Sequence, residues 1–213
     1  MVNKLAKIQP FEKFTKRYDE WFEKHKYAYF SELNALKKAL PPFKKGVEVG
    51  VGTGRFAKPL GIQYGVEPSE KMAEIARKRG IKVVNGVAEN LPFSDESFDL
   101  VLMVTTICFV DDLEKSFKEA YRVLKKGGYI LIGFIDKNSP LGNYYQQIKE
   151  KNPFYKDAVF YSTEEVLDLL KKVGFKNFKI YQTIFHKLDE INSIEPVKEG
   201  YGEGSFVVIL AQK

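Results

Sequence analysis

The sequence predicts an α/β fold that is built on a mostly parallel sheet, and three observations support this prediction. Short apolar segments alternate with helical patterns from residue 43 onward, which is the spacing of strand–helix–strand units. Residues 98–104 form a nearly continuous apolar run, as expected of a strand that is covered on both faces. The last two predicted strands have no helical pattern between them, so we expect them to be antiparallel neighbours.

Residues 1–42 predict helices that form a cap within the same folding unit. Aromatic side chains recur at three- and four-residue steps from Phe11 to Phe22, and leucines continue the pattern as far as Leu40. Two prolines follow and end the helical stretch, because proline lacks the N–H group that a helix needs. The main domain is therefore expected at residues 43–213.

The main domain begins with five predicted strands, at residues 46–49, 62–66, 81–84, 98–104 and 129–135. Three helices are predicted from polar capping residues at their N-termini, namely Ser69, Asp111 or Asp112, and Ser162 or Thr163. Glycines mark the ends of these helices, at Gly80, Gly127 and Gly174. A helix after the first strand is expected to be cut short by Pro59.

The last third of the chain departs from this alternation. Residues 138–161 are polar and aromatic and contain Pro140 and Pro153, which predicts a loop-rich insertion with room for one short helix. Residues 175–185 and 205–211 then supply the two antiparallel strands.

The composition excludes several classes of protein. Of the 213 residues, 44% are hydrophobic and 29% are charged, which is typical of a globular chain rather than a disordered one. Cys108 is the single cysteine, and with only two histidines beside it we expect no metal site. No segment has the ~20 apolar residues of a membrane helix or the apolar core of a signal peptide. We therefore expect a cytoplasmic protein with no membrane partner.

The charge balance is weakly basic. The 34 Lys and Arg residues against 28 Asp and Glu residues give a net charge of +6. The lysines are interleaved with glutamates instead of forming a basic block with aromatic residues, so a nucleic-acid partner is not favoured.

Three glycines follow directly after the strand at residues 46–49, at Gly50, Gly52 and Gly54. Glycines in this place allow a tight turn and let a ligand touch bare backbone. A dinucleotide-binding turn needs glycine or alanine where Arg55 stands, and the Gly-Lys-Ser/Thr of a P-loop is absent. The spacing therefore argues against both of these phosphate-binding sites. Taken alone, the segment also fits a simple turn with no ligand.

Glu67 stands at the end of the second predicted strand, where a carboxylate can accept hydrogen bonds from both hydroxyls of a ribose. It follows the glycines at fewer than the usual ~20 residues, which the shortened first helix explains. The alternative is that Glu67 only caps the helix that begins near Ser69. In either case we expect a solvent-facing side chain with few packing contacts.

From residue 46 to residue 213 the chain resembles the class I S-adenosylmethionine-dependent methyltransferases, in particular the broad group that acts on small molecules. Five segments resemble motifs of this family in the family's order, at residues 47–54, 65–69, 86–93, 97–99 and 119–128. The resemblance implies a Rossmann-like, doubly wound sheet of seven strands that is mostly parallel, with an antiparallel C-terminal strand.

The resemblance also implies S-adenosylmethionine as the cofactor and assigns residues to it. Glu48 would lie near the methionine ammonium group, and Gly50, Gly52 and Gly54 would line the backbone side of the cofactor. Glu67 would hold the ribose hydroxyls.

The adenine and methyl ends of the cofactor are assigned in the same way. Ala88, through its backbone N–H, and Glu89 would border the adenine, and Thr105 would lie beside the methionine moiety and the methyl group. Many relatives carry Asp where Val87 stands, so Glu89 or a water would replace that contact. Relatives often have histidine in the segment 107–110, where an apolar wall is expected here.

The resemblance implies methyl transfer by in-line displacement to a small apolar or aromatic acceptor. Positioning supplies most of such a rate enhancement, so no residue is assigned as catalytic. His25, His186, Tyr18 and Asp19 are candidates for a base only if the acceptor must lose a proton. Cys108 follows the fourth strand, a position where it could act as a nucleophile. A role as a small, buried apolar side chain is favoured instead.

Two segments are candidates for the acceptor pocket. The first offers Tyr18, Trp21 and Phe22, with Phe109 as a further wall, and the second is the insertion at residues 143–161. The first segment also fits an ordinary amphipathic helix over the sheet edge. Two other functions stay open: an RNA or protein methyltransferase, because of the positive charge, and a non-catalytic cofactor-binding module, because of Val87 and the missing histidine.

Overall fold

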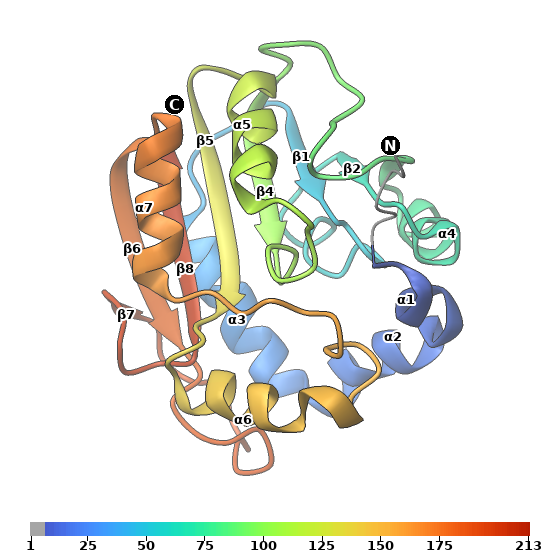
Figure 1. The fold of residues 1–213 in the computed structure, drawn as a ribbon, viewed down its shortest axis with the longest axis vertical. Coiled ribbons are helices and arrows are strands. Elements are labelled where there is room, and N and C mark those ends of the chain that lie inside the picture. The colour runs from blue at the N-terminus through green and yellow to red at the C-terminus, as the bar shows by residue number, and fades with distance from the viewer. Residues whose placement is uncertain (1–6) are drawn as a thin grey trace.

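The computed structural model describes residues 7–213 and contains one sheet with helices on both faces (Figure 1). The strands lie in the order β3-β2-β1-β4-β5-β8-β6-β7. Their bounds are β1 Gly46–Val49, β2 Tyr64–Val66, β3 Lys82–Val84, β4 Phe98–Val104, β5 Leu124–Ile135, β6 Lys176–Thr183, β7 Lys198–Glu199 and β8 Phe206–Gln212.

The direction of the strands confirms the predicted fold class. The pairs from β3 to β5 are parallel, whereas β8 is antiparallel to both of its neighbours, β5 and β6. The structure has one strand more than the seven expected. It is the two-residue β7, which pairs with β6.

The three helices that were predicted from polar capping residues begin at those residues, and four further helices are present among the described residues. Their bounds are α1 Gln9–Lys13, α2 Thr15–Lys24, α3 Lys26–Ala39, α4 Glu70–Lys78, α5 Leu113–Val123, α6 Pro140–Ile148 and α7 Thr163–Val173, with a 3-10 turn at Lys149–Lys151. The side chains of Ser69, Asp112 and Ser162 each accept a hydrogen bond from a backbone N–H in the first turn of α4, α5 and α7. Residues 1–6 of the predicted cap lie outside the described residues.

Two predicted boundaries were wrong. Residues 51–61 form a series of turns, so no helix stands between β1 and β2 for Pro59 to shorten. Gly127 does not end α5, because the chain enters β5 directly after the helix and the glycine lies within that strand. The register of β4 against β5 shifts at this point, which shows that the extra residues are accommodated as an irregularity in the sheet.

Alternate side chains of the central strands face two separate cores. In β4, Leu100, Leu102 and Val104 belong to the core that α3 covers, whereas Val101 and Met103 face the core that α5 and α7 cover. This two-sided burial is the physical reason for the apolar run in the sequence. Because helices cover both faces of the sheet, the C-terminal ends of the parallel strands are the part of the sheet that is available to bind a ligand.

A carboxylate joins the N-terminal helices to the turn that contains Gly50, Gly52 and Gly54, which we call the glycine turn. Asp19 of α2 accepts hydrogen bonds from the side chains of Arg55, Arg79 and Thr53 at 2.7–2.9 Å. Burial alone would raise the pKa of Asp19, but the two guanidinium groups hold that pKa well below its ordinary value. Arg55 stands where a dinucleotide-binding turn needs glycine or alanine. Its side chain instead joins the cap to the sheet.

We predict that Asp19→Ala lowers the free energy of unfolding by about 2 kcal/mol, because two partly buried guanidinium groups lose their partner. The matched control is Glu23→Ala, which removes only an exposed partner of Arg55 and should cost less than ~1 kcal/mol. Urea denaturation of both variants measures the difference, and equal losses would contradict a structural role for Asp19.

Candidate cofactor and acceptor site

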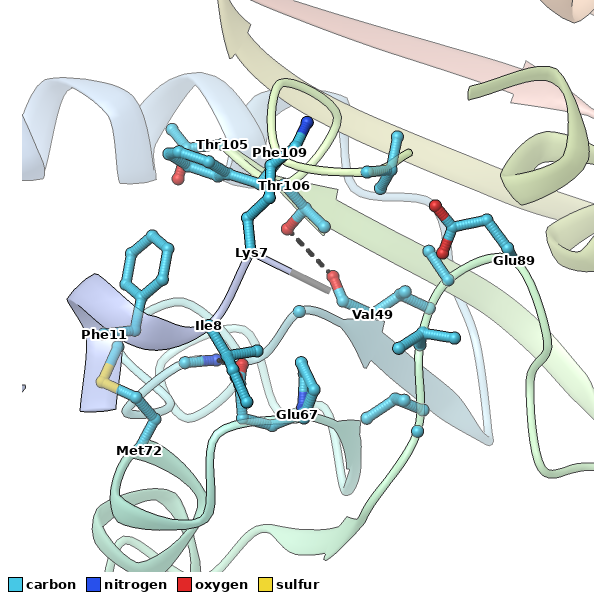
Figure 2. Close-up of a pocket in the computed structure, with 18 of the residues that line it drawn as sticks. Lys7, Ile8, Phe11, Val49, Glu67, Met72, Glu89, Thr105, Thr106 and Phe109 are labelled. Atoms are coloured by element: carbon cyan, nitrogen blue, oxygen red, sulfur yellow. Dashed lines mark hydrogen bonds between the residues drawn. The ribbon is translucent and has the colours of Figure 1, made fainter. Parts of the chain in front are cut away.

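A cleft lies at the C-terminal ends of β1, β2 and β4, where ligands bind in open parallel sheets (Figure 2). Its walls come from five stretches of the chain, within residues 7–18, 49–52, 66–72, 86–89 and 104–111. Charged groups stand on opposite walls, with Glu67 near the start of α4 and Glu89 before β4 (Figure 2).

The cleft brings together most of the residues that the sequence singled out. They come from all five of these stretches and are Tyr18, Gly50, Gly52, Glu67, Ala88, Glu89, Thr105 and Phe109. Four other candidates, Glu48, Gly54, Trp21 and Phe22, are not among the residues that line it.

The glycine turn lies so close to the segment after β4 that a side chain at Gly50 would not fit. Gly50 has a φ of +69°, and a Cβ placed there would lie 2.6 Å from the side chain of Thr106. The Thr106 hydroxyl donates to the carbonyl of Val49 at 3.0 Å, which fixes it against the turn (Figure 2). At Gly54 a Cβ would instead lie 3.4 Å from Ala76, so this glycine serves the packing of α4.

Glu67 is buried, and the expectation of a solvent-facing side chain with few contacts was wrong. Its side chain accepts hydrogen bonds from the backbone N–H groups of Gly52 at 2.8 Å and Ser69 at 2.9 Å. Burial raises the pKa of Glu67 to about 7, against the opposing effect of these two bonds. Because a carboxylate can accept about four hydrogen bonds, each oxygen retains capacity for a ligand in the cleft.

Glu48 is a buried carboxylate on β1, only 1% exposed. Its Oε2 atom is the one buried side-chain oxygen or nitrogen without a hydrogen-bond partner among residues 7–213. Burial raises the pKa of Glu48 well above its ordinary value. An unsatisfied buried carboxylate costs free energy, so this position is suited to a cationic ligand group.

The loop before β4 forms one end of the cleft. Ala88 is buried, and its backbone N–H donates to no other backbone or side-chain group that the structure describes. Glu89 accepts hydrogen bonds from the backbone N–H groups of Asp111 at 2.6 Å and Asp112 at 3.2 Å through the same oxygen. Its other oxygen is available to a ligand, whereas Val87 lines the cleft without a polar side chain.

Thr105 has a strained backbone at the end of β4. Its φ is +50°, which a β-branched residue rarely adopts, and its N–H donates to the carbonyl of Gly133 at 2.7 Å. Such strain is maintained where surrounding contacts impose it, often at functional sites. Cys108 follows nearby, and burial raises the pKa of its thiol to about 12, which fits a filler rather than a nucleophile.

An aromatic cluster closes the cleft beside Thr105. Phe11 of α1 contacts Phe109, with ring centroids 5.1 Å apart, and Phe154 of the insertion, with centroids 5.5 Å apart. Tyr18 of α2 joins the cluster through Phe11. The N-terminal segment therefore contacts the insertion beside the cleft, although no residue of the insertion at 143–161 is among those that line it.

Two of the predicted acceptor residues lie elsewhere. Phe22 is only 5% exposed and packs in the core against Phe56, while the ring of Trp21 contacts His25. Phe11 lines the cleft instead. It belongs to the aromatic pattern of the N-terminal segment, but it was not among the predicted acceptor residues. Other lining residues that sequence reasoning missed are Lys7, Ile8, Met72, Thr106 and Asp111.

No group of three or more potential metal ligands occurs among residues 7–213. Among the helices that the structure describes, none is both long and apolar enough to cross a membrane.

Comparisons with known proteins assign the family. A family model described as a methyltransferase domain matches residues 47–132. The chain is 61% identical to a protein of Thermotoga maritima described as an S-adenosylmethionine-dependent methyltransferase and possible histamine N-methyltransferase. The crystal structure of that protein has a TM-score of 0.94, and the match covers 97% of this chain and 99% of that chain.

Two relatives extend the comparison. A protein of Methanocaldococcus jannaschii described as uncharacterized is 52% identical over 203 residues, which cover 95% of this chain and 98% of the relative. The demethylmenaquinone methyltransferase of Lactococcus lactis is 30% identical over 162 residues, which cover 73% of this chain and 60% of that enzyme. Because the identity to the Thermotoga protein extends over nearly the whole of both chains, the protein belongs to the class I S-adenosylmethionine-dependent methyltransferases and is an enzyme that uses S-adenosylmethionine.

Proposed function

We propose that the enzyme methylates a small acceptor with an apolar or aromatic body by in-line displacement. The observation that carries this proposal is the aromatic cluster of Phe11, Tyr18, Phe109 and Phe154 beside Thr105, at one end of the cleft. Flat aromatic walls of this kind favour a ring-containing ligand over an extended polar chain.

The chain's own groups can hold the cofactor along the cleft. The unpartnered Oε2 atom of Glu48, which directly precedes the lining residues Val49 and Gly50, fits the methionine ammonium group. The bare backbone of Gly50 and Gly52 fits a closely approaching ligand. The free capacity of Glu67 fits the ribose diol, and the backbone N–H of Ala88 fits an adenine nitrogen. When bound, S-adenosylmethionine supplies a methyl group on a positively charged sulfur.

The remaining contribution of the protein is orientation and exclusion of water. A well-oriented pair of reactants can gain ~7–11 kcal/mol over free encounter, so few polar groups are needed at the reacting centre. Of the four candidate bases, Tyr18 alone lines the cleft. Burial raises the pKa of Tyr18, so its hydroxyl stays protonated and acts as a hydrogen-bond donor. Asp19 is occupied by two arginines.

The relatives support an acceptor that contains a ring. The Thermotoga protein is described as a possible histamine N-methyltransferase, and the Lactococcus enzyme as a demethylmenaquinone methyltransferase. Both descriptions name small molecules with a planar ring, and the aromatic cluster is suited to such a group.

We predict methyl transfer to at least one small aromatic compound. Tritiated S-adenosylmethionine would be incubated with aromatic amines, hydroquinones and phenols, and separately with bulk RNA and a protein mixture. Label in the small products supports the proposal. Label in RNA or protein alone would contradict it, and tight cofactor binding with no labelled product in any arm would favour a non-catalytic module.

We predict that Glu67→Gln weakens binding of S-adenosylhomocysteine by about 10- to 150-fold, since a charged hydrogen bond contributes ~1.5–3 kcal/mol. Calorimetric titration measures the affinity. In the wild type, affinity should rise as the pH increases through about 7, because the ionised Glu67 accepts hydrogen bonds from both hydroxyls. The glutamine variant should lose this dependence.

The matched control is Glu165→Gln. Glu165 also accepts a backbone N–H at the start of a helix, from Ser162 at 2.7 Å, but it belongs to α7 and does not line the cleft. This control should lower the thermal midpoint and leave the affinity unchanged. If Glu67→Gln also lowered only the thermal midpoint, its role would be limited to joining the glycine turn to α4.

A further inference from the structure

A short segment of the N-terminal cap crosses the mouth of the cleft. It comprises residues 7–13, which include α1, and we call it the strap. Lys7, Ile8 and Phe11 of the strap all line the cleft (Figure 2). The ring of Phe11 also contacts Phe109, which follows β4. The strap therefore supplies most of the wall that the cap contributes to the cleft.

One carboxylate fastens the strap to the start of α4. Glu12 accepts hydrogen bonds from the hydroxyl of Ser69 at 2.7 Å and from the backbone N–H of Lys71 at 3.3 Å, through the same oxygen. The hydrogen bond from Ser69 holds the pKa of Glu12 below its ordinary value. The backbone N–H of the same serine donates to Glu67 at 2.9 Å. Glu12 is consequently joined, through one residue, to the carboxylate that fits the ribose.

An ion pair fastens the other end of the strap to the far side of the cleft. The ammonium group of Lys7 lies 3.7 Å from the carboxylate of Asp111, in the loop between β4 and α5. The backbone N–H of Asp111 in turn donates to Glu89 at 2.6 Å. This fastening therefore ends beside the loop that fits the adenine.

The two fastenings lie on opposite sides of the glycine turn. In the sheet β1 stands between β2 and β4, and α4 follows β2 whereas Asp111 follows β4. Neighbouring strands are ~4.8 Å apart, so the ends of β2 and β4 are separated by roughly 10 Å. One helical turn and the side chains of Lys7 and Glu12 cover that distance. The strap consequently passes over the end of β1, where the glycine turn begins.

The strap is held less firmly than the rest of the cap. No side chain of α1 is buried, whereas eight residues of α3 are buried. α2 is held separately, by the ion pairs of Asp19 with Arg55 and Arg79. Phe14, with a φ of −119° and a ψ of 29°, interrupts the helix between α1 and α2. Because segments with few buried apolar contacts open at a low cost in free energy, α1 can swing away at Phe14 while α2 stays in place.

We propose that the strap closes over the bound cofactor and that Glu12 and Lys7 are the positioning residues that hold it closed. Release of these two contacts admits S-adenosylmethionine and lets S-adenosylhomocysteine leave. Because Phe11 belongs to the strap, closure also completes the aromatic wall for the acceptor. The inference rests on the proposed function, in which the cofactor lies along the glycine turn.

The experiment measures how fast S-adenosylhomocysteine dissociates from Glu12→Ala. Glu12 does not line the cleft, so its replacement removes a fastening without removing a lining side chain. Radiolabelled S-adenosylhomocysteine would be bound to the enzyme and chased with an excess of the unlabelled compound. Dissociation should be about tenfold faster from Glu12→Ala than from the wild type, because a hydrogen bond to a charged group is lost. The association rate should not fall, since an open strap admits the ligand.

Two control variants separate the fastening from general charge. Glu12→Gln keeps an acceptor oxygen for Ser69 and should dissociate more slowly than Glu12→Ala. Glu20→Ala removes an exposed carboxylate of α2 that pairs with Lys16, and it should dissociate at the wild-type rate.

Amide hydrogen exchange gives a second readout, which a merely structural role for Glu12 would not change. In the strap, the N–H groups of Glu12 and Phe14 donate to the carbonyls of Ile8 and Pro10. In the ligand-free enzyme these amides should exchange faster than the amides of α2. S-adenosylhomocysteine should slow their exchange in the wild type and much less in Glu12→Ala. The wild-type comparison needs no variant, so it tests the strap even if Glu12→Ala is unstable.

Four results would overturn the inference. They are equal dissociation rates for the wild type and Glu12→Ala, an increase in Glu20→Ala as large as that in Glu12→Ala, no recovery in Glu12→Gln, and exchange in the strap that does not respond to the ligand. The proposed methyl transfer would stand in each case. Failure to methylate any small compound would remove the proposed function instead, and these measurements, which use the cofactor product alone, would still decide the role of the strap.

Discussion

The site depends on the close approach of the glycine turn to the ends of its neighbouring strands. The backbone N–H groups of Gly50 and Val51 both donate to the carbonyl of Val66, at 2.8 and 3.0 Å. Glu67 then holds the turn from the side of β2, and Thr106 closes against Gly50 from the side of β4. Three strands are thereby fixed around one short stretch of bare backbone, and the remaining cleft walls are arranged around it.

Three carboxylates, one partly buried and two buried, form a series in how completely the protein satisfies their hydrogen-bonding capacity. Asp19 is fully engaged by two arginines, which hold its pKa low, and it fastens the cap. Glu67 accepts two backbone bonds, and burial raises its pKa to about 7. Glu48 has an oxygen without a partner, and burial raises its pKa well above the ordinary value. Because unmet hydrogen-bonding capacity is costly, the less satisfied groups are those best suited to meet a ligand.

The sequence predicted local features well and long-range ones poorly. Residues 98–104 were predicted as a strand with its observed bounds, since burial on both faces leaves a continuous apolar signal. Periodicity placed the aromatic residues on one helical face but could not show that Phe14 separates two helices, which brings Phe11 to the cleft and Phe22 to the core.

The side chain of Arg55 links the glycine turn to the N-terminal cap, which a glycine at this position could not do. Its guanidinium group extends from the glycine turn to Asp19 of α2, which follows Tyr18 directly in the chain. The cap that supplies the aromatic wall is therefore bonded to the same turn that lines the cleft. The ion pair of Arg55 with Asp19 thus fixes the position of the aromatic wall relative to the glycine turn.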